Sequence, residues 1–297
     1  MQHIALEHDT DWAGFTRAAR WAVQAGLAPQ ALSLATRTGT GSSAGLFDGD
    51  ATVAAASLPD TAALRLPGAL VALLQRATLH REPQRFDLAY RLLWRLSQPA
   101  LRPQALDPLD TDRRRLDLLA KAVQRDMHKA KAFVRFRPCA EAMPSARATT
   151  YPTADPEAQV QQVAWFEPEH HVLMAVAPFF ARRFANLRWA ILTPDMSVRW
   201  DGHELHPGPP ARREHAPGPD AGEALWLAYY ASIFNPARTK PAMMKKEMPV
   251  RYWRNLPEAV LIAPLLAGAA ERTGRMLAQT TPVQRQRRKG QGGGRPG

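Results

Sequence analysis

The chain has 297 residues, of which 45% are hydrophobic and 8% aromatic, so it is long enough to bury a sizeable core. It contains no run of about 18 apolar residues, which excludes a membrane-spanning helix. The start, MQHIALEHDTDW, lacks the basic and apolar regions of a secretory signal. The single cysteine, Cys139, excludes an internal disulfide, a four-cysteine zinc site and an iron–sulfur cluster. We therefore expect a cytoplasmic protein without a cofactor.

The net charge of +12 is unevenly distributed along the chain. Seven arginines and lysines and no acid fall between Arg272 and Gly297, so the residues before them carry the remaining +5. A moderately basic body with a strongly basic tail indicates a polyanionic partner such as nucleic acid. The alternative is a compositional bias toward arginine, alanine and proline that says nothing about partners.

The N-terminal region begins with a weakly alternating segment, residues 3–7, that predicts a short strand. A helix is expected from Asp11, a good N-cap, to Gly26, a good helix stop, with an apolar stripe that includes Phe15 and Ala19. Residues 37–66 are rich in glycine, serine, alanine and threonine. They predict a loop with one short element near the sequence TVAAA.

Three further helices are expected before residue 130. The first starts at Pro67 and extends to residue 80, and the second covers residues 84–97. The third, residues 111–130, shows the clearest helical spacing, and its polar face carries arginine and lysine.

After residue 130 the apolar period changes to two, which indicates strands. A proline-containing helix is expected at residues 168–185. The dipeptide Asp201-Gly202 between alternating residues predicts a tight hairpin. The fold class is therefore α+β, with a central, mostly antiparallel sheet of about four strands packed with helices. The expected strands are residues 131–137, 159–166, 187–193 and 197–205.

Residues 1–278 are predicted to form a single α/β-type domain. Its helical part would extend to about residue 130, its sheet-containing part would follow, and its C-terminal region would again be helical. Residues 279–297 are basic and glycine-rich, which predicts a disordered tail or linker.

The stretch FEPEHHV places Glu167, Glu169, His170 and His171 within five positions. On a helix, the two adjacent histidines would point about 100° apart, so one metal ion could not easily bind both, and no metal site is expected. Glu167 or Glu169 with His170 could form a proton-transfer pair, and these three are the candidate catalytic residues. The structural alternative is a helix start, where acids favour the positive end of the dipole.

Cations interleaved with aromatic residues supply the candidate nucleic-acid contacts. In the expected strand KAFVRFR, Phe133 would lie among Lys131, Arg135 and Arg137, so that the ring could stack on a base while the cations hold phosphates. The alternative is an amphipathic strand with Phe133 tucked under a helix. The complete set of candidate contacts is Lys129, Lys131, Phe133, Arg135, Arg137, Arg182, Arg183, Lys245, Lys246 and Arg251.

Three long motifs carry a family resemblance: MHKAKAFVRFR, WFEPEHHVLMAVAPFFARRFANLRWAILTPD and LWLAYYASIFNPARTKPAMMKKEMPVRYWRNLPEA. Together they resemble a family of DNA-metabolism and DNA-repair proteins whose activity is not established. Members of this family occur beside a radical-SAM DNA-modification protein or fused upstream of a uracil-DNA glycosylase-like domain. The resemblance implies a DNA-repair context and partners of these two kinds. The fused glycosylase domain would need four cysteine ligands, so its activity and its cluster are not assigned to this chain.

Three hypotheses follow from these observations. In the first, the protein is a DNA-binding accessory module of a base-repair system that acts with a uracil-DNA glycosylase-like or radical-SAM partner. In the second, it is a DNA-repair enzyme, a glycosylase or hydrolase that uses Glu167, Glu169 and His170. In the third, it is a protein–protein adaptor without DNA contact.

Overall fold

The computed structural model describes residues 1–37, 52–62, 64–139, 161–218 and 241–268, together with a few positions between 223 and 232. The chain divides into two compact units, Met1–Pro219 and Asp220–Gly297. The fold is a mixture of helices and two β-sheets, which confirms the α+β class. Among the described helices, none is both long and apolar enough to cross a membrane.

A three-stranded parallel sheet opens the first unit. Its strands β1 (Gln2–Leu6), β2 (Leu32–Thr36) and β3 (Thr52–Ala54) have the order β2-β1-β3. Helix α1 (Trp12–Gln24) connects β1 to β2. Asp11 caps α1 by accepting a hydrogen bond from the Gly14 N–H at 2.7 Å, and Gly26 follows the helix with φ of +69°, as predicted. The sequence predicted a single central sheet, so this separate three-stranded sheet was not expected, and β2 was not predicted.

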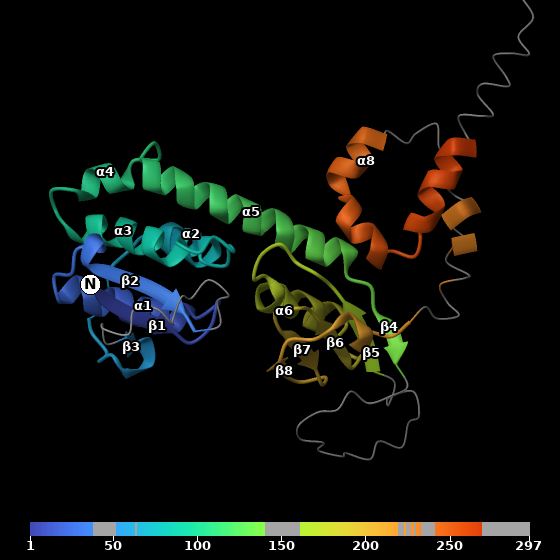
Figure 1. The fold of residues 1–297 in the computed structure, drawn as a ribbon, viewed down its shortest axis with the longest axis horizontal. Coiled ribbons are helices and arrows are strands. Elements are labelled where there is room, and N and C mark those ends of the chain that lie inside the picture. The colour runs from blue at the N-terminus through green and yellow to red at the C-terminus, as the bar shows by residue number, and fades with distance from the viewer. Residues whose placement is uncertain are drawn as a thin grey trace, which may run out of the picture. The chain divides into compact units, whose positions relative to one another are not determined.

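Four helices follow the parallel sheet: α2 (Gly68–Ala77), α3 (Arg85–Ser97), α4 (Arg102–Leu106) and α5 (Thr111–Phe133). Helices α2 and α3 both pack against α5. Asp110 caps α5 by accepting from the Arg113 N–H at 3.0 Å, and its carboxylate also pairs with Arg95 of α3. The sequence prediction of α2, α3 and α5 is confirmed, and Figure 1 shows α5 extending from α3 and α4 to the region of α6.

The expected strand at residues 131–137 is wrong, because α5 continues to Phe133 and only Arg137–Cys139 form a strand, β4. Ala130 is buried seven residues after buried Val123, and the Val134 N–H donates to the Ala130 carbonyl at 3.1 Å, so the helical period persists past residue 130. Lys131 and Phe133 are therefore separated by about 200° around a helix and do not share the face of a strand.

A second sheet of five strands occupies the rest of the first unit, in the order β4-β5-β6-β7-β8. Strands β5 and β6 are parallel, and the other three neighbouring pairs are antiparallel. The mostly antiparallel character agrees with the prediction, but the sheet has five strands rather than four. The strands after β4 are β5 (Gln161–Trp165), β6 (Trp189–Leu192), β7 (Ser197–Trp200) and β8 (Leu205–Gly208).

The turn between β7 and β8 is the predicted hairpin. Gly202 has φ of +104°, a conformation that favours glycine. The Asp201 carboxylate accepts hydrogen bonds from the His203 and Glu204 N–H groups, both at 2.8 Å. Local turn chemistry therefore determines this part of the sheet.

Helix α6 covers Leu173–Arg183 and connects the parallel strands β5 and β6. The predicted helix began at residue 168, and this boundary is wrong. Tertiary contacts explain the later start of the helix: the backbone N–H of His170 donates to the Asp126 carboxylate, and the backbone N–H of His171 donates to the Leu79 carbonyl, both at 2.9 Å. Glu167 and Glu169 therefore precede the helix by several residues and do not occupy its first turn.

The described part of the second unit is helical, as expected for the C-terminal region. It includes helical positions between residues 223 and 232, α8 (Pro241–Glu247), the 3₁₀-helix η6 (Val250–Asn255) and a helix at residues 259–268. Tyr252, Leu256 and Ile262 are buried within it. The predicted basic tail at residues 279–297 lies outside the described residues.

Candidate functional site

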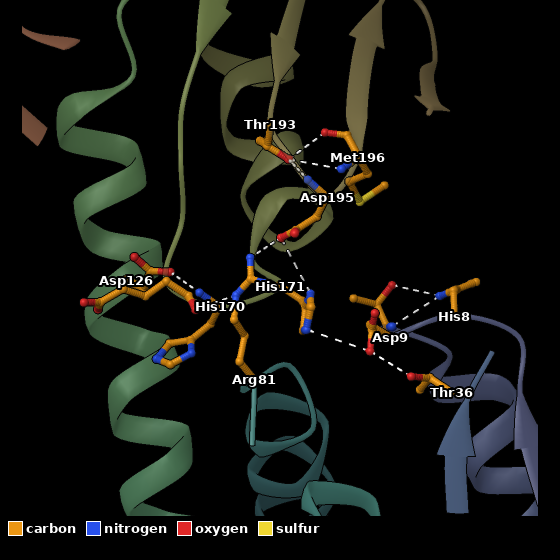
Figure 2. Close-up of polar contacts among 12 residues, drawn as sticks. His8, Asp9, Thr36, Arg81, Asp126, His170, His171, Thr193, Asp195 and Met196 are labelled. Carbon is orange, nitrogen blue, oxygen red and sulfur yellow. Dashed lines mark hydrogen bonds and ion pairs between the residues drawn. The ribbon is translucent and has the colours of Figure 1, made fainter. Parts of the chain in front are cut away.

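Polar and ionisable side chains from five segments of the first unit meet around the FEPEHH stretch. We call them the histidine–carboxylate cluster. They come from the β1–α1 loop, the α2–α3 turn and the start of α3, helix α5, the β5–α6 segment and the β6–β7 turn (Figure 2). The members are Asp9, His80, Arg81, Arg85, Asp126, His170, His171 and Asp195.

His170 is held in a buried position by contacts with α5 and with the α2–α3 turn. Its ring lies against the His80 ring with a centroid separation of 4.0 Å, and the residue is only 9% exposed. Its backbone N–H donates to Asp126, which is 0% exposed. The Nδ1 atom of His170 is buried and has no hydrogen-bond partner among the described residues. Burial, together with the neighbouring His80 and Arg81, lowers the pKa of His170 to about 4.

His171 faces the other way, into a group of carboxylates and guanidinium groups (Figure 2). Its Nε2 lies 4.0 Å from a carboxylate oxygen of Asp9, and its Nδ1 lies 3.9 Å from one of Asp195. Arg85 binds the Asp9 carboxylate at 2.8 Å, and Arg81 pairs with Asp195. Burial lowers the pKa of His171, although the nearby Asp9 carboxylate opposes this shift.

The carboxylate of Asp9 is also anchored to the parallel sheet, since it accepts from the Thr36 hydroxyl at 2.9 Å. Burial of Asp9 raises its pKa, but the hydrogen bond from Arg85 and the other polar neighbours outweigh this effect, so the pKa is lowered. Asp9 is therefore ionised at neutral pH, and His171 lies between two carboxylates that each have an arginine partner.

The three candidate catalytic residues have different neighbours in the structure. The Glu167 carboxylate accepts from the Trp165 indole N–H at 2.7 Å, and the Glu169 side chain is exposed while its carbonyl accepts from Arg81 at 2.9 Å. The His170 ring is buried on His80. The imidazole that faces carboxylates is that of His171, which sequence reasoning treated only as a metal ligand. Asp9 and Asp195 are remote in sequence, so no local signal could have identified this pairing.

The described residues hold no group of three or more histidine, cysteine, aspartate or glutamate side chains that could bind a metal ion. The rings of His170 and His171 also point to different sides of the chain, as Figure 2 shows. The cluster can therefore transfer protons or fix segments together, and its described side chains do not form a metal centre.

A second feature lies where the end of α5 packs on α6, and we call it the α5–α6 basic surface. It consists of Lys131 at the end of α5 and of Arg182 and Arg183 at the end of α6, and Arg183 lies 5.8 Å from the centroid of the Phe184 ring. The Lys131 ammonium lies 5.2 Å from the centroid of the Phe179 ring. Arg182 and Arg183 follow Phe179 by three and four residues, which places them on the same side of α6. All three cations are exposed, and among the described residues none of them forms an ion pair.

The sequence around this surface contains few acids to offset its charge. Residues 127–139 and 170–194 include no aspartate or glutamate. Phe136 packs against Phe180 of α6 and Phe184 directly after it, at centroid distances of 5.8 and 5.4 Å, and so holds the chain after α5 against α6. The cations are thus presented by a packed aromatic layer.

The other candidate nucleic-acid contacts are more dispersed. Lys129 and Phe133 are half-buried on α5. Arg135 is exposed and donates to the Ala132 carbonyl at 2.6 Å, whereas Arg137 is half-buried and donates to the Pro217 carbonyl at 3.1 Å. The remaining three, Lys245, Lys246 and Arg251, belong to the second unit, where Arg251 lies over the Tyr252 ring at 4.6 Å.

These observations define a mixed α+β protein that carries a partly buried histidine–carboxylate cluster and an exposed basic surface. The family described as a domain of unknown function (DUF4130) matches residues 83–258, and the chain belongs to this family. No curated protein and no solved structure matches the chain. The matched region includes Asp126, His170, His171, Asp195 and the α5–α6 basic surface, and it begins after Asp9, His80 and Arg81.

Proposed function

We propose that this protein is a DNA-binding accessory module of a base-repair system, which acts with a uracil-DNA glycosylase-like or radical-SAM partner. The observation that carries DNA binding is the α5–α6 basic surface, where three exposed cations have no ion-pair partner among the described residues and two of them lie over aromatic rings, Lys131 over Phe179 and Arg183 over Phe184. The repair context rests on the resemblance of the three long motifs to DNA-repair proteins.

Unpaired cations on a rigid surface are suited to phosphate contact. Arginine and lysine that neutralise phosphates release condensed counterions, so affinity falls steeply with salt. Phe179 is half-buried beneath Lys131, and a partly exposed ring beside cations can contribute stacking with an unpaired base. The net charge of +12 provides long-range attraction toward a polyanion.

Helix dipoles offer a competing explanation for the same charges. Lys131 lies in the last turn of α5, and Arg182 and Arg183 lie in the last turn of α6, where cations stabilise a helix by roughly 0.3–1 kcal/mol each. The two explanations predict different consequences of neutralising the charges. If the cations act only on the helix dipoles, neutralising them lowers the stability of the protein. If they contact phosphates, neutralising them lowers the affinity of the protein for DNA.

The test is to measure binding of the full chain to short duplex and single-stranded oligonucleotides over a range of salt concentrations. We expect the double variant Arg182→Gln/Arg183→Gln to bind more weakly, with a salt slope reduced by about 0.9 for each duplex phosphate that the variant no longer neutralises. The matched control is Arg102→Gln/Arg114→Gln, which removes two exposed arginines from α4 and the start of α5. Arg114 is about 25 Å from Lys131 along α5, estimated from the helical rise.

Equal affinity of the test and control variants would overturn the assignment of the α5–α6 basic surface. Absence of DNA binding by the wild-type chain at low salt would overturn the proposed function as a whole. If in that case a glycosylase-like or radical-SAM protein were still retained by the chain, the adaptor hypothesis would take its place.

A further inference from the structure

We propose that the histidine–carboxylate cluster is an acid-sensitive latch. At neutral pH it fastens the β1–α1 loop and the α2–α3 turn to the β5–α6 segment, and on acidification it opens before the rest of the first unit unfolds. This inference is independent of the proposed function, because it concerns the internal contacts of the first unit and no contact with DNA.

The latch has a defined set of fastening contacts. The backbone N–H of His171 donates to the Leu79 carbonyl, and the Arg81 Nε donates to the Glu169 carbonyl, each at 2.9 Å. Each of the two segments, the α2–α3 turn and the β5–α6 segment, therefore donates one hydrogen bond to the other. Arg81 also pairs with Asp195 in the β6–β7 turn. Arg85 links the same region to Asp9 in the β1–α1 loop.

His170 is the group whose protonation opposes closure most directly. Its buried Nδ1 has no acceptor among the described residues, so an added proton would create a buried, charged donor without a partner. The His80 ring lies 4.0 Å away, and two charged imidazoles at that distance repel each other. The other charged groups near the ring are Arg81, Arg125 and His171, and the nearby Asp126 carboxylate binds the His170 backbone N–H.

His80 and His171 experience mixed environments. His80 accepts a hydrogen bond from the Glu82 N–H at 2.9 Å through its Nδ1, and it lies near the Glu82 carboxylate, Arg85 and Arg115. His171 faces the carboxylates of Asp9 and Asp195 and the guanidinium groups of Arg81 and Arg85. Carboxylates therefore partly accommodate a proton on His171, whereas the described neighbours of the His170 ring are mostly basic.

The direction of the pH effect follows from these environments. Burial lowers the pKa of His170 to about 4 in the closed form, and an exposed histidine in the open form has a pKa of about 6.5. The open form therefore binds more protons between these two pH values, and acidification shifts the equilibrium toward it. Between pH 7.5 and pH 5 this linkage favours opening by roughly 30-fold at most.

Hydrogen exchange of the full chain at pH 7.5 and pH 5, corrected for the pH dependence of intrinsic exchange, tests the latch. The amides of residues 79–85 and 169–172 should exchange roughly tenfold or more faster at pH 5 than at pH 7.5 after this correction, whereas α3 after Arg85 should keep its protection. In His170→Gln most of the additional opening at pH 5 should disappear, and the remainder reports His80 and His171, whose pKa values burial also lowers. The control His203→Gln replaces an exposed histidine in the β7–β8 hairpin and should behave as the wild type.

His170→Phe provides a second test variant, because it keeps a ring on His80 and cannot be protonated. Unchanged protection of the latch peptides at pH 5 in the wild type would overturn the proposal. The same conclusion would follow if the protection of α3 after Arg85 decreased together with that of the latch peptides, or if a folded variant without the His170 imidazole retained the full acid response.

Discussion

The histidine–carboxylate cluster and the α5–α6 basic surface both belong to the first unit and both use helix α5, but their charged groups are in opposite environments. In the cluster, Asp9 and Asp195 have arginine partners, and the His170 and His171 rings are largely buried. On the basic surface, the described cations are exposed and lack ion-pair partners. A buried charge must be paired to be tolerated, whereas an exposed cation costs little and remains available for an external anion. From this comparison we predict that substitutions in the cluster mainly change the stability of the fold, whereas substitutions on the basic surface mainly change the binding of anions.

The largest effect on stability is expected from Arg85→Met. Arg85 is 4% exposed, binds the Asp9 carboxylate and donates to the Thr78 carbonyl at 2.8 Å. Removing the guanidinium group leaves partly buried Asp9 without its cation, so the free energy of unfolding should fall by about 3 kcal/mol. Denaturant unfolding at neutral pH measures this change. A decrease below about 1 kcal/mol would show that the cluster contributes little to the fold.

The next largest effect is a decrease in the free energy of unfolding of the wild type as the pH is lowered. Because the folded pKa of His170 is lowered to about 4 by burial, the unfolded chain binds more protons between about pH 4 and pH 6.5. Stability contributed by neutral His170 is therefore complete above this window and decreases as the pH falls through it, by about 2 kcal/mol at pH 5. Urea titrations at several pH values check the prediction, and His170→Phe should flatten the profile. An equally steep profile in that variant would assign the pH response to other groups.

A smaller effect is expected from Lys131→Gln on DNA affinity. Removing the cation that neutralises one phosphate should weaken binding by about 1 kcal/mol, or roughly fivefold, at low salt and reduce the salt slope by about 0.9. Lys131→Arg keeps the charge and should retain most of the affinity. Fluorescence anisotropy with labelled oligonucleotides measures both variants. Equal weakening by glutamine and arginine would attribute the effect to packing on Phe179 and not to charge.

The smallest effect is expected from Arg81→Met, the same substitution at the exposed edge of the cluster. The Arg81 side chain is 43% exposed, and exposed ion pairs contribute about 0–1 kcal/mol. We expect the free energy of unfolding to fall by about 0.5 kcal/mol under the conditions used for Arg85→Met. Equal decreases for the two variants would mean that burial does not distinguish the two arginines.

Elements with strong local signals were predicted well from the sequence. The Asp11 and Gly26 boundaries of α1, the helical spacing of α5 and the Asp201-Gly202 hairpin each depend on neighbouring residues, and the structure confirms them. The prediction of a strand at residues 131–137 is wrong because alternation of apolar and polar residues over only seven positions is also compatible with the end of a long helix. The predicted start of α6 is wrong because backbone hydrogen bonds to Asp126 and Leu79 keep residues 170–171 out of the helix.

The sequence by itself determined the mixed α+β class, most helices, the basic character and the concentration of ionisable groups in FEPEHH. Only the tertiary structure decided which histidine faces carboxylates, which ring is buried, and that Lys131 of α5 lies over Phe179 of α6. The physical reason is the separation along the chain of the residues that interact. Helix caps, periodicity and turns depend on residues a few positions apart, whereas burial and pairing of charge depend on segments that only folding brings together.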